Sequence, residues 1–207
     1  NRTEYACQDI GDFQGEGVWV ETKSQLEQLH ESGCEGIDGE LRVYFVPGVK
    51  DLSLLKNVTY VRSNIEIAYT HDLESLDGLD NLRDYPAITL HQNDKLVDTT
   101  SLVLPESANE NRGFGLFVTF NASLQSLGGL DGLQNLARVS IVGNEDLKEI
   151  PALADVYTDS EESLTVRFRV ERNPKLPQCR VDEILNRLPE DQYISVTGNN
   201  DSAATCE

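Results

Sequence analysis

Several common features are missing from this 207-residue chain. It has no methionine and begins at Asn1, so we expect a processed chain or a fragment from which any signal peptide has been removed. It has no run of 18 apolar residues, so we expect no membrane-spanning helix. It also lacks the G-x-S-x-G, H-E-x-x-H, CxxC and phosphate-loop patterns. These absences argue against the commonest hydrolase, zinc and nucleotide-binding classes.

Basic residues are also scarce. There are 17 Lys and Arg against 36 Asp and Glu, which gives a net charge of −19. Nucleic acids and anionic lipid surfaces attract basic proteins, so neither is an expected partner. The acidity is explained by solubility alone, by a cationic partner, by calcium or by a saline habitat, and composition does not choose among these four.

The four cysteines form two local pairs, one near each end of the chain. Cys7 and Cys34 are 27 residues apart, and so are Cys179 and Cys206. This spacing predicts the disulfides Cys7–Cys34 and Cys179–Cys206, and with them an oxidising compartment, so we expect a secreted or cell-surface protein. Four free buried thiols are the alternative.

Pairs of apolar residues at i and i+2 recur along the chain at steps of 23 to 29 residues. Such a period is typical of a solenoid in which each repeat stacks on the next, and alternation at i and i+2 indicates strands with one buried face. Solenoids of this kind usually display a binding surface. The eight pairs are Val18/Val20, Leu41/Val43, Ile65/Ile67, Ile88/Leu90, Leu116/Val118, Val139/Ile141, Phe168/Val170 and Ile194/Val196.

Five residues after the start of five of these strands, the residue is asparagine. Val46 and Thr70 occupy this position in earlier repeats. Asparagine adopts left-handed backbone geometry readily and hydrogen-bonds nearby backbone groups, so we expect a buried structural ladder rather than a row of ligands. Its members are Asn93, Asn121, Asn144, Asn173 and Asn199.

Two segments have helical spacing, at 24–32 and 181–188, and each lies beside a cysteine pair. Ser24 is the expected N-cap of the first, with Glu27 three residues later. We therefore expect one domain over 1–207, with an N-terminal cap at 1–36, repeats at 37–176 and a C-terminal cap at 177–207. Polar insertions at 103–113 and 154–163 are expected to protrude as loops.

The segments "SGCEGIDGELRVYF" (32–45) and "DLSLLKNVTYVRSNIEIAY" (51–69) resemble the receptor L domain, the ligand-binding lobe of the epidermal growth factor and insulin receptors. The resemblance extends over about 7–206. It implies a mainly β fold, a short right-handed β-helix or leucine-rich-repeat-like solenoid of about eight rungs with helical caps at both ends. It also implies an extracellular, non-enzymatic binding role. The regular "SLDGLDNL" (75–82) and the acidity look more like a microbial surface or secreted relative.

Few residues suit catalysis. His30, His71 and His91 have no evident nucleophile partner, and acidic pairs such as Asp77/Asp80 are expected on solvated faces. We therefore expect no catalytic residues, no metal site and no cofactor.

The outward face of the strands is the expected binding surface. The positions next to the inward pairs carry the only Trp, a Tyr and an Arg in the early repeats and a Phe in the fifth, and such residues commonly anchor interfaces. The main hypothesis is a recognition domain that binds a protein or glycan through this face or through the protruding loops. The alternative is a structural or adhesive cell-envelope module without a soluble ligand, anchored through segments outside this chain. The expected ligand-binding residues are Trp19, Arg42, Tyr44, His91 and Phe117.

Overall fold

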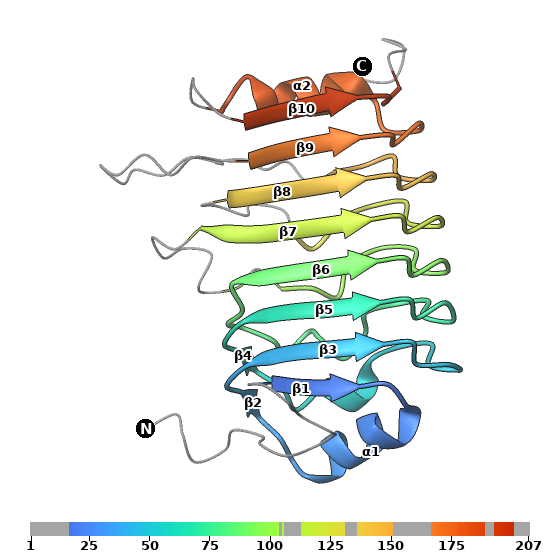
Figure 1. Ribbon diagram of the computed structural model, residues 1–207, viewed down its shortest axis with the longest axis vertical. Coiled ribbons are helices and arrows are strands. Elements are labelled where there is room, and N and C mark those ends of the chain that lie inside the picture. Colours follow the sequence, from blue (N-terminus) through green and yellow to red (C-terminus); the bar gives the residue numbers. More distant parts are fainter. Residues whose placement is uncertain are drawn as a thin grey trace.

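The computed structural model describes residues 17–103, 105, 113–130, 136–150, 167–188 and 193–200. Its main feature is an open sheet of eight parallel strands, ordered β1-β3-β5-β6-β7-β8-β9-β10 (Figure 1). Apart from β2 and β4, each strand lies beside the next in sequence. The strands are β1 (Gly17–Val20), β3 (Glu40–Tyr44), β5 (Asn64–Ala68), β6 (Ala87–His91), β7 (Phe114–Thr119), β8 (Leu136–Val142), β9 (Arg167–Glu171) and β10 (Tyr193–Thr197).

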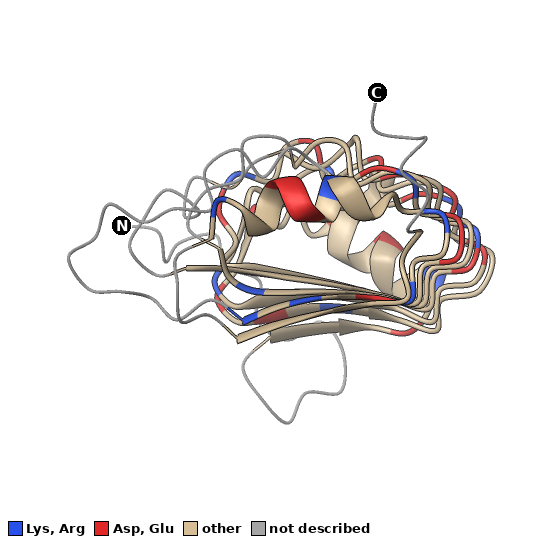
Figure 2. Cartoon of the chain, turned by 90° about the horizontal axis from the view of Figure 1, so that it is seen from above, with Lys and Arg blue, Asp and Glu red and all other residues tan. Residues whose placement is uncertain are grey.

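The remaining described elements are small. Strands β2 (Gly36–Ile37) and β4 (Tyr60–Val61) pair into a two-stranded sheet, and a 3-10 turn, η1, spans Ser53–Leu55. The two α-helices are α1 (Lys23–Glu31) and α2 (Gln178–Leu185). Both helices and the chain returning between strands lie on one face of the large sheet (Figure 2). The other face carries the outward side chains of the strands.

The core lies between the sheet and the returning chain. The apolar pairs of neighbouring strands are in register, for example Leu41 with Ile65 and Ile65 with Ile88, so that each pair stacks on the next. Those from β1 to β9 are buried. The pair in β10 is not part of this core to the same degree, because Ile194 is 47% exposed. Period-2 alternation therefore places the strands, and the two edge strands differ: the pair in β1 is fully buried and the pair in β10 is not.

The expected fold class is wrong. A β-helix of eight rungs needs its sheet to curl into a closed coil, whereas the described residues form one open parallel sheet and only two α-helices. The apolar residues at three-residue spacing do not build a second continuous sheet. They form turns, η1, the short β2–β4 pair and isolated bridges such as Ser126 with Glu149. The helices lie near the two ends of the sheet without making it a capped β-helix (Figure 1).

The helix starts also differ from expectation. Helix α1 is capped by Thr22, not Ser24: Gln25 N donates to Thr22 Oγ1 at 3.2 Å, and Thr22 N donates to Gln25 Oε1 at 3.0 Å. This reciprocal capping box uses glutamine in place of the expected Glu27. Helix α2 begins at Gln178 and ends at Leu185, three residues earlier than expected at each end. In the part of the chain that is described, no helix has the length and apolar character needed to cross a bilayer.

The five asparagines lie in one buried column where the turns leave the sheet. Each amide bonds to the next: Asn121 N donates to Asn144 Oδ1 and Asn144 N donates to Asn173 Oδ1, both at 3.0 Å. The Nδ2 groups bond backward to strand carbonyls, as Asn144 does to Val118 O at 3.0 Å. Thr70 N begins the column by donating to Asn93 Oδ1. The side-chain oxygens of the column thus accept hydrogen bonds from buried backbone N–H groups in the turns, which would otherwise be unsatisfied.

Both described cysteines, Cys34 and Cys179, are in disulfides. They lie near opposite ends of the sheet, Cys34 between α1 and β2 and Cys179 within α2 (Figure 1), so they are not bonded to each other. Cys7 and Cys206 lie outside the described residues. The pairing Cys7–Cys34 and Cys179–Cys206 therefore stays a prediction.

Candidate functional site

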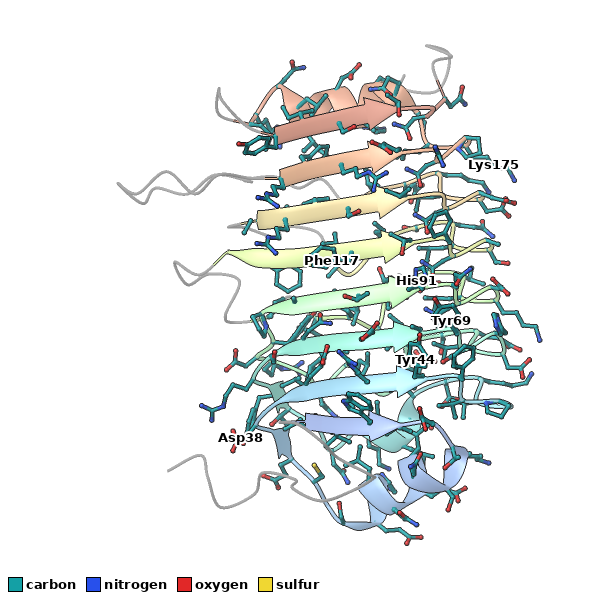
Figure 3. All side chains as sticks on the ribbon, in the orientation of Figure 1. Asp38, Tyr44, Tyr69, His91, Phe117 and Lys175 are labelled. Atoms are coloured by element: carbon teal, nitrogen blue, oxygen red, sulfur yellow. The ribbon has the colours of Figure 1, made fainter. Side chains whose placement is uncertain are left out.

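The five expected binding residues all lie on the outward side of the sheet and are at least partly exposed, with Trp19 the most exposed at 41%. They do not form one group. Trp19 and Arg42 contact each other on β1 and β3, Tyr44 and His91 lie at the C-terminal ends of β3 and β6, and Phe117 lies farther along the sheet on β7 (Figure 3). The structure thus divides the expected surface into three places.

The first place is held together by charge pairing. The Arg42 guanidinium lies 4.7 Å from the centre of the Trp19 ring, as in a cation–π contact. Its Nε is 2.8 Å from Glu40 Oε2 and 3.2 Å from Glu66 Oε2. These are ion pairs without hydrogen-bond alignment, since Nε is buried and has no hydrogen-bond partner. Arg42 is therefore committed to its neighbours, which makes it a weak candidate for an outside ligand.

The second place is built by an unusual backbone position. The residue directly after each of seven strands, from β3 to β10, is in the left-handed region, with φ between +51° and +70°. Bulky residues rarely adopt this conformation, and it is strained for them. Two of the seven are glycines, which adopt it freely. The seven are Phe45, Tyr69, Gln92, Phe120, Gly143, Arg172 and Gly198.

Three of these left-handed residues are aromatic, and together with Tyr44 and His91 they form a continuous group, which we call the aromatic strip: Tyr44, Phe45, Tyr69, His91 and Phe120. Phe45 stacks on Tyr69 with ring centres 4.7 Å apart, and Tyr69 meets Tyr44 at 5.0 Å and His91 at 4.9 Å, both edge to face. His91 reaches Phe120 at 6.0 Å. Figure 3 shows Tyr44, Tyr69 and His91 side by side at the strand ends.

Hydrogen bonds fix the middle of the strip. His91 Nδ1 lies 2.6 Å from Thr119 Oγ1, and His91 Nε2 lies 3.1 Å from the Tyr69 hydroxyl. Desolvation and the neighbouring Tyr69 phenol raise the pKa of Tyr44, so its phenol is neutral and able to donate near pH 7. The strip therefore presents exposed apolar ring atoms beside hydroxyl and imidazole groups.

Small residues under the strip make room for the rings. Ala68 is in register with Tyr44 on one side and His91 on the other, and it is fully buried. The expectation that every outward position is solvent-facing is wrong here, because a short side chain beneath Tyr69 leaves the space that the larger rings fill. Val142 is buried on the same face.

A hollow of about 590 Å³ continues the strip beyond Phe120. Gly143, directly after β8, lies between Phe120 and Arg172 in its lining, and a Cβ at Gly143 would lie 2.6 Å from Phe120 Cδ1. Lys175 and Asp146 form an ion pair of 2.5 Å at its rim. The aromatic strip thus adjoins, at Phe120, a hollow whose edge carries a negative charge on Asp146 and a positive charge on Lys175.

The sequence patterns missed Phe45, Tyr69 and Phe120. Each comes one residue before a member of the buried column: Phe45 before Val46, Tyr69 before Thr70 and Phe120 before Asn121. An aromatic residue directly before a column position is the sequence signal that could have identified them. The expected loops at 103–113 and 154–163 lie almost wholly outside the described residues.

Chemical groups that could hold a metal do not gather on the described residues, where no cluster of three or more His, Cys, Asp or Glu is present. The most perturbed carboxyl is Glu171, whose pKa is lowered to about 2 because Arg169 and Ser195 hydrogen-bond to it. Arg169 is 2.8 Å away, so this carboxylate is committed to the sheet face.

Comparison with known proteins gives no relative: no family model matches the chain, and no curated protein or solved structure is significantly similar to it. The functional argument therefore rests on the surfaces themselves.

Proposed function

We propose that this protein is a non-catalytic extracellular recognition domain that binds a protein or glycan through the aromatic strip. The observation that supports this most directly is the placement of Phe45, Tyr69 and Phe120 in the left-handed conformation with their rings at the surface. Phe45 is 54% exposed and Phe120 is 46% exposed.

Stability gives these residues no net advantage over glycine. A left-handed conformation costs a non-glycine residue about 1 kcal/mol, and burial of about half of each ring recovers about the same amount. Gly143 and Gly198 occupy the equivalent positions on later strands, so the backbone accepts glycine there. Strained, exposed aromatic side chains that glycine could replace are typical of a surface kept for binding.

The chemistry of the strip fits a protein or a glycan. Aromatic faces with phenol and imidazole groups beside them bind apolar surface and donate hydrogen bonds at the same time, as anchors do in protein interfaces. Sugar rings present the same combination of apolar faces and hydroxyls.

The extracellular setting is supported by the disulfides of Cys34 and Cys179, since such bonds persist mainly in oxidising compartments. The resemblance of segments 32–45 and 51–69 to the receptor L domain points in the same direction. We therefore propose secretion or display at a cell surface.

The test uses glycine substitutions that the backbone already tolerates. Phe45→Gly/Phe120→Gly removes two exposed rings and relieves strain, so the free energy of unfolding should change by less than about 1 kcal/mol. Binding to the glycans and peptides that the wild-type protein recognises on defined arrays should weaken about thirtyfold, which corresponds to about 2 kcal/mol for lost anchors.

The matched control is Gln92→Gly, because Gln92 has the same left-handed backbone but no aromatic ring. It should keep wild-type binding. Equal binding by the double variant, or an equal loss in Gln92→Gly, would contradict a role for the strip. A wild-type protein that binds nothing on either array would contradict the recognition function.

A further inference from the structure

A second surface lies on the outward face of the last strands, around Arg138 and Arg167. These two residues are directly opposite each other in the register of β8 and β9. Neither side chain forms an ion pair or a hydrogen bond in the part of the chain that the structure describes. The one described contact is the Arg167 guanidinium, 5.8 Å from the centre of the Tyr193 ring.

Unpaired arginines are unexpected in so acidic a chain. Like charges opposite each other on neighbouring strands are destabilising. Several other basic side chains on the described surface pair with carboxylates, for example Arg62 with Asp38, Lys95 with Asp72 at 2.7 Å and Lys50 with Glu74 at 2.9 Å. Among the described residues, by contrast, no carboxylate pairs with the exposed guanidiniums of Arg138 and Arg167.

The surroundings form a built hollow of about 560 Å³. Phe117 borders it on β7 and Tyr193 on β10, three strand intervals away, which is about 14 Å. Ser140 and Ser195 also line the hollow, and their short side chains leave space between Phe117 and Tyr193. Gly115 makes room for the Phe117 ring, because a Cβ there would lie 3.0 Å from Phe117 Cε2.

We propose that this hollow binds an acidic sugar. The guanidiniums of Arg138 and Arg167 hydrogen-bond to its carboxylate or sulfate, and the Tyr193 ring packs against its apolar face. Two adjacent guanidiniums match the oxygens of such a group and would lose their mutual repulsion when it binds. Tyr193 is 69% exposed, so its ring is available for stacking. The hollow is distinct from the aromatic strip.

A sugar fits better than an acidic peptide strand. The backbone groups of β7, β8 and β9 are already paired on both sides, so an extended peptide cannot add a strand beside the two arginines and could join the sheet only at its edge strand, β10. The width between Phe117 and Tyr193 suits one or two sugar rings. The inference rests on the glycan branch of the proposed function and names the class of glycan.

The experiment titrates the full chain with a glucuronic acid oligosaccharide, a sulfated glucose oligosaccharide, the neutral glucose oligosaccharide of the same length and hexaglutamate, by calorimetry at low and moderate salt. At least one acidic sugar should bind tenfold or more tightly than the neutral one, and the affinity should fall as salt rises. The two acidic sugars distinguish a carboxylate site from a sulfate site.

Arg138→Gln/Arg167→Gln should weaken that binding at least tenfold while the melting temperature is unchanged or higher. Lys56→Gln/Lys148→Gln removes the same charge from exposed residues away from the hollow and should weaken binding less than twofold. Equal binding of the neutral sugar, equal loss in both double variants, or no binding of any acidic sugar would overturn the proposal. Tighter binding of hexaglutamate would replace the sugar with an acidic protein.

The two proposals fail separately. Phe45→Gly/Phe120→Gly should leave acidic-sugar binding at the hollow intact. If the aromatic strip binds an array ligand while no acidic sugar binds, the hollow proposal alone is wrong. If only the acidic sugar binds, and the arginine variant abolishes it, the strip proposal alone is wrong.

Discussion

The early and late strands of the sheet share one backbone plan and carry opposite surfaces. On β3 and β5, Arg42 is neutralised by Glu40 and Glu66 and the left-handed positions hold aromatic rings. On β8 and β9, Arg138 and Arg167 lie opposite each other with no ion pair to a described residue, and the position after β8 is Gly143. The inward apolar pairs fix the backbone in both halves, which leaves the outward side chains free to specialise.

Charged residues also gather at the turns, along the edge where the strands end (Figure 2). Acidic and basic segments alternate along the edge where the strands end, as expected from pairs such as Lys95 with Asp72 and Lys175 with Asp146. Pairing is therefore the rule at this edge of the molecule. Arg138 and Arg167, on the outward face, differ from these pairs because no carboxylate among the described residues pairs with them.

The largest expected effect on the free energy of unfolding comes from removing the disulfides near the two ends of the sheet. Cys34→Ala and Cys179→Ala should each lower the free energy of unfolding by about 3–4 kcal/mol, because a closed loop of this length restrains the unfolded chain. Urea unfolding measures the loss at each end. Non-reducing peptide mapping should give Cys7–Cys34 and Cys179–Cys206, and a peptide joining Cys34 to Cys206 would contradict that pairing.

The next effect compares early and late members of the buried column. Asn144→Ala should lower the free energy of unfolding by about 3 kcal/mol, because Asn121 N and Val118 O lose their partners. Thr70→Val should cost less than about 1 kcal/mol, since the preceding member is already Val46 and the Thr70 hydroxyl makes one long bond of 3.3 Å.

The control for this pair is Asn81→Ala. Asn81 is exposed and donates to Lys56 O at 3.0 Å, so its loss should cost well under 1 kcal/mol. Equal shifts in urea midpoint for Asn81→Ala and Asn144→Ala would mean that the column does not stabilise the late strands.

A smaller effect depends on pH and belongs to the late half. The pKa of Glu171 is lowered from 4.5 to about 2, so its hydrogen bonds stabilise the fold above pH 4.5 and that contribution is lost as pH falls toward 2. Glu171→Gln should therefore cost about 1 kcal/mol at pH 7, after allowance for solvent screening. The difference from wild type should shrink steadily in urea titrations between pH 4.5 and pH 2; a constant difference would argue against the pairing.

The smallest effect tests the opening contrast most directly, because it predicts opposite signs for two arginines on one face. Arg42→Ala should lower the free energy of unfolding by about 1 kcal/mol, since Glu40 and Glu66 then face each other without a cation. Arg167→Ala should leave it unchanged or raise it by about 0.5 kcal/mol, because the repulsion from Arg138 is removed. Thermal melts at low salt give both signs, and equal destabilisation by the two variants would remove the distinction.

The strands were predictable from sequence because their cause is local. Pairs such as Ile65/Ile67 alternate inward with period two wherever the chain is extended, and the asparagine column follows from a fixed distance after each strand. The closure of the fold was not predictable in this way. It depends on whether the returning chain forms a second sheet, and residues at three-residue spacing such as Leu76 and Leu79 pack equally well from turns.

The aromatic strip was half predictable. Tyr44 and His91 could be assigned to the outward face by alternation. Phe45, Tyr69 and Phe120 could not be assigned in this way, because each directly follows a strand and alternation no longer applies there. Their own left-handed backbone conformation sets the direction of their side chains. The pairing of Arg42 was equally hidden, since Glu66 approaches it only across the register of β3 and β5.

The rings of the aromatic strip have a further consequence, because the sheet sets their spacing. Phe45 and Tyr69 are 4.7 Å apart, and Tyr69 and His91 are 4.9 Å apart. A chain-like ligand laid across these strands meets a ring at each interval. A polymer whose repeat matches that interval, or a multiple of it, stays in phase along the strip, whereas any other repeat drifts out of phase within a few units. The strip would then select a polymer by the length of its repeat rather than by the shape of one unit.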